Sequence, residues 1–571
     1  MPLTRRWLSS MKMIGRRVSV NLSVQEWKDH GISLQTILKR GGGTGLALEF
    51  FSEISESRDE ESVVFAPGMM AGTNAPAAHW CAAAYRDPLK RKTMISYFGG
   101  HWGAGLKQAG IGILEIFGQA PFLTLLVVEN GEIRFLDASE LAGLSTNKTH
   151  RRVETLLGDG YQIACIGPAG EKKLPFSSLV FEGGYQRNSA GLGAVMARLG
   201  VKAIAVKGNV RITPASPQEF FNEARGLREC FAQIKFPFRE LSAYGSSYFL
   251  GKLHAQALLP IKNFTTSALN EVDELLGKEL YEAAGRLAVA CSGCPVGCRS
   301  RVKIGDSWVE APGIEEIIAL GTLCGIQDLK TIFRLKTRCD SLGLDPISIG
   351  GVLACWMEEG EEEGKGPFRF GDGKTALELL NRKDLSGIME RLGPADLDNG
   401  QNCIGSKLIG FMNTDPRGDP HLAINRLTWP FAEPHLLGSV VFLPAVAAYQ
   451  ADKGETDVAS AVIDYQDLSL GLEALGFCPW SALSLGPAHL DNLVRTALGV
   501  EVPQHVVTCL GREIIRDLGP RISSQTEIQG KHTSWFQRFS ITPIPDGPRK
   551  GQLLHLEPVL TKYVDKRNKQ L

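Results

Sequence analysis

The chain has 571 residues, including 63 glycines and 12 cysteines, and a formal net charge of zero. This length allows two to four domains with a large core, and the balanced charge argues against a broad surface for nucleic acid or anionic lipid. No apolar run reaches about 18 residues, so no membrane span is expected. Twelve cysteines without regular pairing are typical of a reducing compartment, and we expect a cytoplasmic protein.

The N-terminal part of the chain, residues 1–210, is rich in short β-type runs between glycine turns. The clearest runs are 62–66, 122–128, 161–166 and 201–206. Asn130 and Gly131 lie between two such runs and predict a hairpin turn. This part is therefore predicted to form a β-rich domain.

Helical periodicity begins near Ser216 and continues through most of the remaining chain. The expected helical segments are 217–231, 279–289, 314–342 and a block over 437–498. The acidic run 358–366 is expected to be a solvated loop. The predicted fold class is α+β, with a β-rich domain over 1–210 followed by two mostly helical domains over 211–412 and 413–571.

Three cysteines lie within eight residues, in the stretch Cys291-Ser-Gly-Cys294-Pro-Val-Gly-Cys298. Zinc prefers paired Cys-x-x-Cys knuckles, and no second pair is present. Buried structural thiols would not need glycine and proline between them. An iron–sulfur cluster needs cysteines on a tight loop and a fourth thiolate from elsewhere, and it is the favoured interpretation. Cys478, in a bend marked by Gly476 and Pro479, is the expected fourth ligand.

Two segments far apart in the chain share one pattern of an acidic residue, a glycine three positions later and then an apolar residue. They are Asp340-Ser-Leu-Gly-Leu344-Asp345 and Glu473-Ala-Leu-Gly-Phe477-Cys478. Each alone is consistent with an ordinary helix C-terminal cap. The presence of two copies favours a cofactor with two similar halves.

Over nearly its whole length the chain resembles the tungsten-dependent aldehyde:ferredoxin oxidoreductase family. The resemblance is carried by a series of short motifs in one order. These are APGMMAGTNAP at 66–76, FGGHWGAGLK at 98–107, IGPAGE at 166–171, AGLGAVM at 190–196, IKNF at 261–264, the three-cysteine loop, the Asp340 segment, DPRG at 415–418 and the Cys478 bend.

The resemblance implies a mononuclear tungsten, or molybdenum, held by two pterins beside a [4Fe-4S] cluster, with the β-rich domain as the base under the pterins. The implied cluster ligands are Cys291, Cys294, Cys298 and Cys478. Backbone around Gly99, Gly100, Arg187, Asn188, Gly191 and Gly193 would cradle one pterin and its phosphates. Asp340, Leu344 and Asp345 match the segment for one pterin, and Glu473 and Phe477 match the segment for the other. A carboxylate can accept two N–H bonds from the edge of a pterin.

Glu315 and His435 match the acid and the imidazole near the metal of the family. Oxidising an aldehyde to an acid requires water activation, removal of a proton and transfer of two electrons. A carboxylate can act as the base, and an imidazole can donate to the developing oxyanion. Apart from the resemblance, an exposed helix carboxylate and an ordinary loop histidine are the simpler interpretations.

The chain also departs from the family at several positions. Trp80, Tyr97 and Leu437 stand where an arginine, an asparagine and a lysine are common. Arg334 and Thr337 replace the residues that bind an interfacial metal in some family dimers, so a homodimer would lack that metal.

The expected function is oxidation of a small aldehyde to a carboxylic acid, with electrons passed through the cluster to ferredoxin or to iron–sulfur or flavin partner subunits. One alternative is the tungsten subunit of a class II benzoyl-CoA reductase-like complex, which the apolar departures would suit. The other is a degenerate, non-catalytic paralogue that serves as a structural or electron-relay subunit.

Overall fold

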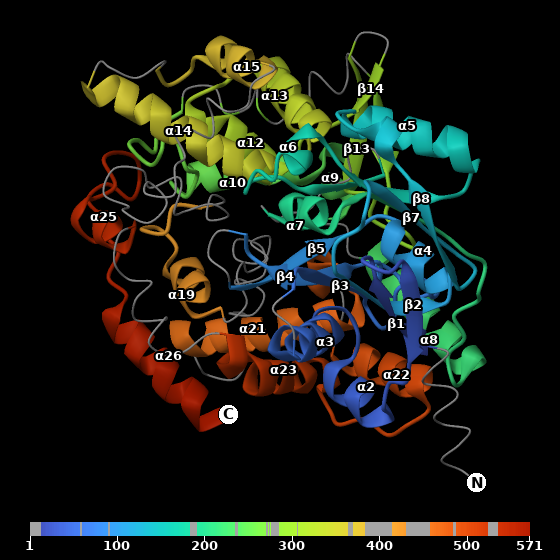
Figure 1. Cartoon of the computed structure of the whole chain (residues 1–571). Helices are drawn as coiled ribbons and strands as arrows, with labels where there is room; N and C mark the ends of the chain where they lie inside the picture. The colour runs from blue at the N-terminus through green and yellow to red at the C-terminus, as the bar shows by residue number, and fades with distance from the viewer. Residues whose placement is uncertain are drawn as a thin grey trace.

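The computed structural model describes residues 13–57, 60–88, 92–182, 191–233, 238–269, 272, 275, 285–304, 307–363, 369–382, 414–429, 457–483, 487–522 and 535–570. Within this part of the chain, the N-terminal third is built on two β-sheets, and the remainder is mostly helical (Figure 1). The predicted α+β class is confirmed.

The first sheet has six strands in the order β2-β1-β6-β3-β4-β5. In that order the strands are Glu26–His30, Arg16–Asn21, Ile111–Phe117, Ser62–Pro67, Cys81–Arg86 and Thr93–Phe98. Neighbours are antiparallel except β1 and β6, which run parallel. Every residue of β3 is buried, because one face of the sheet packs against the helices and the other against the second sheet.

The second sheet has five strands in the order β10-β9-β11-β7-β8. In that order the strands are Leu179–Phe181, Gln162–Ile166, Val201–Lys207, Thr124–Glu129 and Glu132–Asp137. The turn between β7 and β8 has Asn130 at φ 49° and Gly131 at φ 91°, as the predicted Asn-Gly hairpin requires. The Phe98 ring of the first sheet stacks on Phe181 of the second, with centroids 3.9 Å apart, so the two sheets share a core.

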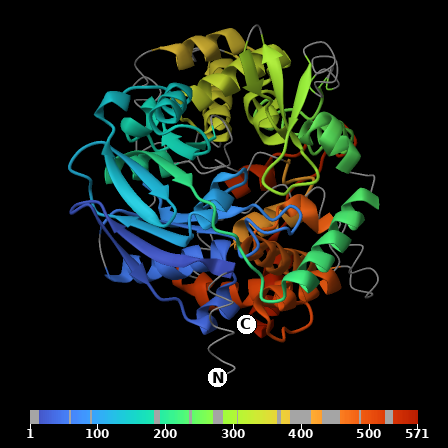
Figure 2. The same ribbon diagram turned by 90° about the vertical axis from the view of Figure 1, so that its right-hand side faces the viewer.

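Helices accompany both sheets and make up most of the remaining chain. Those of the N-terminal third are α2 (Leu34–Arg40), α3 (Gly43–Ser57), α4 (Trp102–Gln108), α5 (Thr146–Leu157), α6 (Pro168–Glu171) and α7 (Leu192–Leu199). The helices that follow are α8 (Pro217–Gln233), α9 (Phe238–Tyr244), α10 (Leu250–Ala255), α12 (Ile314–Leu320), α13 (Leu329–Leu342), α14 (Pro346–Glu363), α15 (Gly373–Asn381), α19 (Pro420–Thr428), α21 (Val458–Leu475), α22 (Pro487–Leu498), α23 (Val506–Ile522), α25 (Trp535–Ile541) and α26 (Glu557–Gln570). In Figures 1 and 2, α12 to α15 lie on one side of the sheets, and the orange and red helices α21 to α23 lie on the other.

Three sequence predictions are wrong. The segment 314–342 is not one helix, because α12 ends at Leu320 and α13 begins at Leu329, after its N-cap Asp328. Residues 286–289 form strand β12 (Arg286–Val289) instead of the end of a helix, because they pair with β13 (Arg299–Ile304) in a three-stranded sheet completed by β14 (Ser307–Glu310). The start of the acidic run, residues 358–363, continues helix α14 instead of forming a loop. Glu358 is held there by an ion pair with Arg538, at 2.7 Å, and by a hydrogen bond from Asn263.

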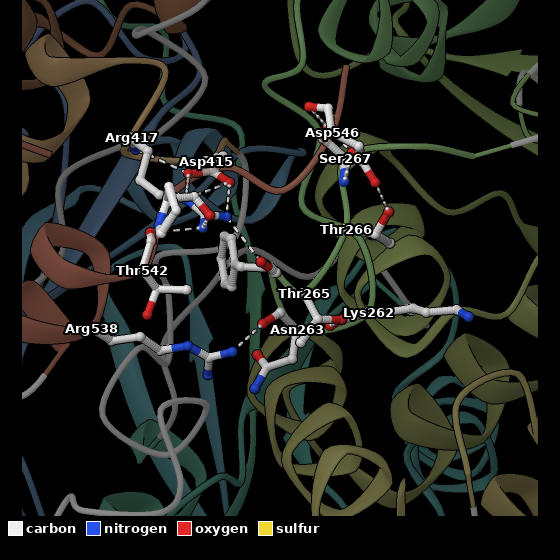
Figure 3. Close-up of polar contacts among 12 residues, drawn as sticks. Lys262, Asn263, Thr265, Thr266, Ser267, Asp415, Arg417, Arg538, Thr542 and Asp546 are labelled. Atoms are coloured by element: carbon white, nitrogen blue, oxygen red, sulfur yellow. Dashed lines mark hydrogen bonds and ion pairs between the residues drawn. The ribbon is translucent and has the colours of Figure 1, made fainter. Parts of the chain in front are cut away.

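A buried ion pair explains why the motifs at 261–264 and 415–418 occur together. Arg417 forms a bidentate pair with Asp415 and donates to the carbonyls of Phe264, Thr542 and Pro543 at 2.9 to 3.2 Å (Figure 3). These contacts join three segments of the chain, and Asp415 and Arg417 are 3% and 2% exposed. The role of this pair in the described structure is therefore architectural.

Candidate functional site

One cavity is lined by all four cysteines that the sequence singles out: Cys291, Cys294, Cys298 and Cys478. The first three lie in the loop between β12 and β13, and Cys478 follows the end of α21. None of the four forms a disulfide. The fold thus brings a local three-cysteine loop together with a bend about 180 residues further along the chain.

The two-sheet N-terminal part of the chain, which we call the base domain, contacts both the three-cysteine loop and the Cys478 bend through one residue, Ala77. Its N–H donates to Gly293 O at 3.2 Å, and its carbonyl accepts from the N–H of Cys478 at 2.9 Å. Ser292 N also donates to Gly100 O, at 3.1 Å. Gly293 has φ 67°, a left-handed conformation that glycine adopts without strain. The glycine within the cysteine motif is therefore needed to form the loop.

The lining of the cavity decides which kind of metal group can bind there. Among the described residues, no group of three or more Cys, His, Asp or Glu side chains could hold a metal ion by itself. An iron–sulfur cluster instead bonds each thiolate to a different iron, so its ligands stand further apart. A Cβ added at Gly99 would lie 3.3 Å from Cys291 Sγ, so glycine keeps this wall of the cavity open. The four thiols around one cavity fit the cluster that the sequence predicts.

Burial, with Cys291 and Cys298 close by, raises the pKa of the Cys294 thiol to about 12. In the metal-free chain this thiol therefore stays protonated at neutral pH. A cationic metal centre would remove the proton, as metal ligation does for other thiols. Loading the site is accordingly expected to release protons.

Helices α13 and α21 end in the same Schellman motif, as their shared sequence pattern suggested. In each, a left-handed glycine, Gly343 or Gly476, donates to the carbonyl of the acidic residue three positions earlier, at 3.0 Å in both cases. The next residue donates to the carbonyl just before that acidic residue, at 2.9 and 2.8 Å. The helix-cap interpretation is confirmed, and the two ends have the same geometry.

Both helix ends then pair with the base domain in the same way. Leu344 forms an antiparallel bridge with Ser177, and Phe477 forms one with Ala78. The backbones touch at these places: a Cβ added at Gly68 would lie 2.0 Å from Gly476 Cα, and one added at Gly167 would lie 2.3 Å from the carbonyl oxygen of residue 342. The two segments expected to hold the two pterins are therefore docked on the base by matching contacts.

The acidic residues of these ends, Asp340 and Glu473, each keep one buried oxygen without a hydrogen-bond partner among the described residues. Burial raises the pKa of Asp340 to about 6, although Lys336 lies 2.6 Å away, and raises that of Glu473 to about 8. Thr44 donates a long hydrogen bond, at 3.4 Å, to the other oxygen of Glu473, and the Tyr97 hydroxyl lies near the same carboxyl group. A buried acceptor of this kind is costly unless a ligand supplies a donor. The residues present thus fit a group with an N–H edge at each end.

Several other groups that were expected to contact a pterin form hydrogen bonds within the protein instead. The amides of Gly191 and Gly193 both donate to Ser177 O, at 2.9 and 3.1 Å. Asp345 accepts from Ser348 N, at 2.9 Å, at the start of α14. The carboxylate of Glu182 accepts from the amides that follow Gly100, including Trp102 N at 2.7 Å. Leu344 and Phe477 are buried in the core, and Arg187 and Asn188 lie outside the described residues.

The structure describes only one member of the expected catalytic pair. Glu315 lies in the first turn of α12 and is 7% exposed, which excludes the simple exposed-carboxylate interpretation. Its neighbour Glu316 instead caps the same helix by accepting from Gly313 N at 2.7 Å. His435 and Leu437 lie outside the described residues.

The departures Trp80 and Tyr97 form a buried stacked pair, with ring centroids 5.8 Å apart. Trp80 lines the cysteine cavity, while Tyr97 is a neighbour of Glu473. This aromatic pair thus connects the cysteine cavity to the second acidic helix end.

Arg299 is a residue of the cavity that the sequence analysis missed. It pairs with Glu310, whose other oxygen lies 3.9 Å from Lys336, which in turn pairs with Asp340. A buried run of alternating charges therefore leads from the cavity to the first acidic helix end. In the sequence, the position of Arg299 directly after Cys298 was the feature that could have indicated a place at the cavity.

A β-rich N-terminal part followed by a mostly helical remainder is the fold of a known class of oxidoreductases. The chain belongs to the aldehyde ferredoxin oxidoreductase family: the N-terminal domain of that family matches residues 17–208, and its domains 2 and 3 match residues 227–568.

Named relatives are similar over almost the whole chain. The tungsten-containing aldehyde ferredoxin oxidoreductase of Thermococcus kodakarensis is 27% identical, over 96% of this chain and 95% of its own. The protein of the same name from Pyrococcus horikoshii is 28% identical with the same coverage. Among solved structures, the active-site complex BamBC of benzoyl coenzyme A reductase has a TM-score of 0.71 and 17% identity, over 98% of this chain and 94% of that one, which shows a common fold. Across the described residues, no helix is long and apolar enough to cross a membrane.

The burial of Glu473 predicts a pH-dependent stability for the metal-free protein. Because its pKa is raised to about 8 from an ordinary 4.5, the folded state keeps a proton that the unfolded state releases. The resulting stabilisation is full below about pH 4.5 and is lost as the pH rises toward 8. The free energy of unfolding of Glu473→Gln, measured by urea denaturation, should therefore fall less over this range than that of the wild type. The exposed Glu60→Gln should follow the wild type, and parallel curves for wild type and Glu473→Gln would contradict the assignment.

Proposed function

We propose that this chain is a tungstopterin- and iron–sulfur-dependent oxidoreductase that oxidises aldehydes to carboxylic acids and passes the electrons to ferredoxin or a partner subunit. The observation that carries the proposal is that one base domain contacts both the cysteine cavity and the two acidic helix ends. The four thiols line a single cavity, and two helix ends of matching geometry each present a buried carboxylate oxygen without a hydrogen-bond partner among the described residues. The family and the tungsten-containing relatives support it.

The protein would hold its cofactors through the residues already described. Cys291, Cys294, Cys298 and Cys478 would ligate a [4Fe-4S] cluster. Asp340 and Glu473 would accept N–H bonds from the two pterins of the tungsten, or molybdenum, centre. When bound, these groups would supply a two-electron acceptor and a one-electron relay.

The chain's own residues would prepare the substrate. Glu315, buried at the start of α12, would act as the base that takes a proton from water as it adds to the aldehyde carbon. His435 would donate a hydrogen bond to the oxygen on which charge develops. Exclusion of water around such groups strengthens both interactions.

Metal analysis of protein purified anaerobically tests this proposal most directly. We expect one tungsten or molybdenum and about four irons per chain, together with reduction of viologen dyes by acetaldehyde or benzaldehyde. Iron without tungsten or molybdenum would exclude the enzymatic proposal and would favour a structural or electron-relay subunit.

A second candidate function is favoured by the Trp80–Tyr97 pair. The pair makes the region beside the cavity more apolar, which would suit a low-potential reduction like that of class II benzoyl-CoA reductases. Copurification with flavin and further iron–sulfur subunits, without aldehyde turnover, would support this function over the first.

A further inference from the structure

The three-stranded sheet β12–β14 carries the cysteine loop at one end. Strand β12 ends at Val289, two residues before Cys291, and β13 begins at Arg299, directly after Cys298. The loop that lines the cavity is thus the connection between two strands whose far ends lie at the surface. Figure 2 shows the sheet, in light green, projecting away from the blue base sheets.

One face of this sheet runs from the cavity to the solvent. Leu287 lies opposite Arg301, and Trp308 lies opposite Lys303. Residues directly opposite in antiparallel strands share a face, and alternate residues of one strand share it too. The same face therefore contains Arg299 at the cavity and four residues further out, which we call the outer patch: Leu287, Arg301, Lys303 and Trp308.

The outer patch is apolar and positively charged. Leu287 and Trp308 are 52% and 50% exposed, which is unusual for side chains of this size and polarity, and Arg301 and Lys303 are exposed as well. Glu310, the acidic residue on the described part of the three strands, lies opposite Arg301 on this face, but its side chain is 9% exposed and is paired with Arg299. No exposed carboxylate of these described strands therefore offsets the two cations, although the net charge of the whole chain is zero.

The outer patch is close to the cluster ligands along the chain. Leu287 precedes Cys291 by four residues, and Arg301 follows Cys298 by three. At about 3.3 Å per residue, these separations correspond to roughly 10–13 Å. An electron carrier seated on the patch would therefore lie near the cysteine cavity.

We propose that the outer patch docks a small, acidic iron–sulfur electron carrier. The inference rests on the proposed function, in which electrons leave through the cluster. The two cations would steer and orient an acidic partner, and the exposed tryptophan is of the residue type that most often anchors an interface. The single face of a short sheet suits a small contact of the kind typical of transient electron-transfer complexes.

Binding of a purified acidic two-cluster bacterial ferredoxin to the intact holoenzyme tests the proposal. The double variant Arg301→Glu/Lys303→Glu should weaken this binding about tenfold or more at low salt, and Trp308→Ala should weaken it even at high salt, where charge is screened. Titration calorimetry measures the affinity directly. Iron content and aldehyde-dependent reduction of viologen should remain at wild-type levels in both variants.

A matched charge reversal controls for net charge. Lys28 in β2 and Lys39 in α2 are exposed and belong to elements in the lower half of Figure 1, whereas β13 lies in its upper half. The Lys28→Glu/Lys39→Glu variant should bind the carrier as the wild type does. Equal weakening in both double variants, or unchanged binding in Arg301→Glu/Lys303→Glu, would overturn the docking site.

A holoenzyme that turns over aldehyde with viologen but does not bind the carrier would also overturn the docking site, and it would leave the proposed function standing. Loss of tungsten and of viologen-linked turnover in the wild type would instead remove the proposed function. The two failures are therefore distinguishable.

Discussion

The Cys478→Ala variant is expected to lose its iron–sulfur cluster or to convert it to a form with fewer irons. Of the four cavity thiols, Cys478 is the one supplied by the C-terminal part of the chain. Without it, three thiolates would leave one iron with no protein ligand. Iron per chain should fall below about four, the EPR signal of the reduced cluster should change or vanish, and viologen-linked electron transfer should be lost.

The matched control is Cys230→Ala. Cys230 is a partly buried, unpaired cysteine in α8 and does not line the cavity. This variant should keep the iron content and the EPR signal of the wild type. If Cys478→Ala keeps both as well, Cys478 is not a ligand and the two-part site is wrong.

A methyl group at Gly68 is expected to displace the second helix end from the base. Its Cβ would lie 2.0 Å from Gly476 Cα and 2.3 Å from Gly476 N, and backbone atoms cannot move aside as a flexible side chain can. The neighbouring amides of Met69 and Met70 donate to the carbonyls of Ala474 and Leu475, so the whole contact would have to shift. We expect Gly68→Ala to destabilise the metal-free protein by about 3 kcal/mol or more in urea denaturation.

Iron and tungsten content should also fall in Gly68→Ala, because Glu473 and Cys478 belong to the displaced segment. Gly31→Ala is the control: Gly31 is exposed, and no atom would lie within 4 Å of its added Cβ. Its effect should be within about 0.5 kcal/mol. Wild-type stability and metal content in Gly68→Ala would show that this close backbone approach does not hold the site together.

The duplicated helix ends have a consequence for how the cofactors would be held. Each end is docked on the base by a backbone bridge and by a glycine that permits contact. Both acidic residues are thereby fixed relative to one base, although they belong to helices more than a hundred residues apart in sequence. Such positioning by packed backbone is more precise than positioning by flexible side chains.

Local pattern was enough to predict much of this protein. Strands β3, β7, β9 and β11, the Asn130–Gly131 hairpin and helix α8 depend on periodicity and turn residues within one short segment. The matching caps at Gly343 and Gly476 were visible because a left-handed cap selects glycine at one position. The cysteine loop was visible for the same reason, since its glycines permit the turn.

The tertiary structure decided whatever depends on a partner distant in the chain. Residues 286–289 form a strand because they pair with β13. Glu358 lies in a helix and forms an ion pair with Arg538, which is distant in the sequence. Only the fold shows that Ala77 joins the cysteine loop to Cys478, and that Arg299 is linked through Lys336 to Asp340. Contacts of this kind are stabilised by burial and by pairing with residues distant in the sequence. Neither produces a periodic pattern in the local sequence from which it could be predicted.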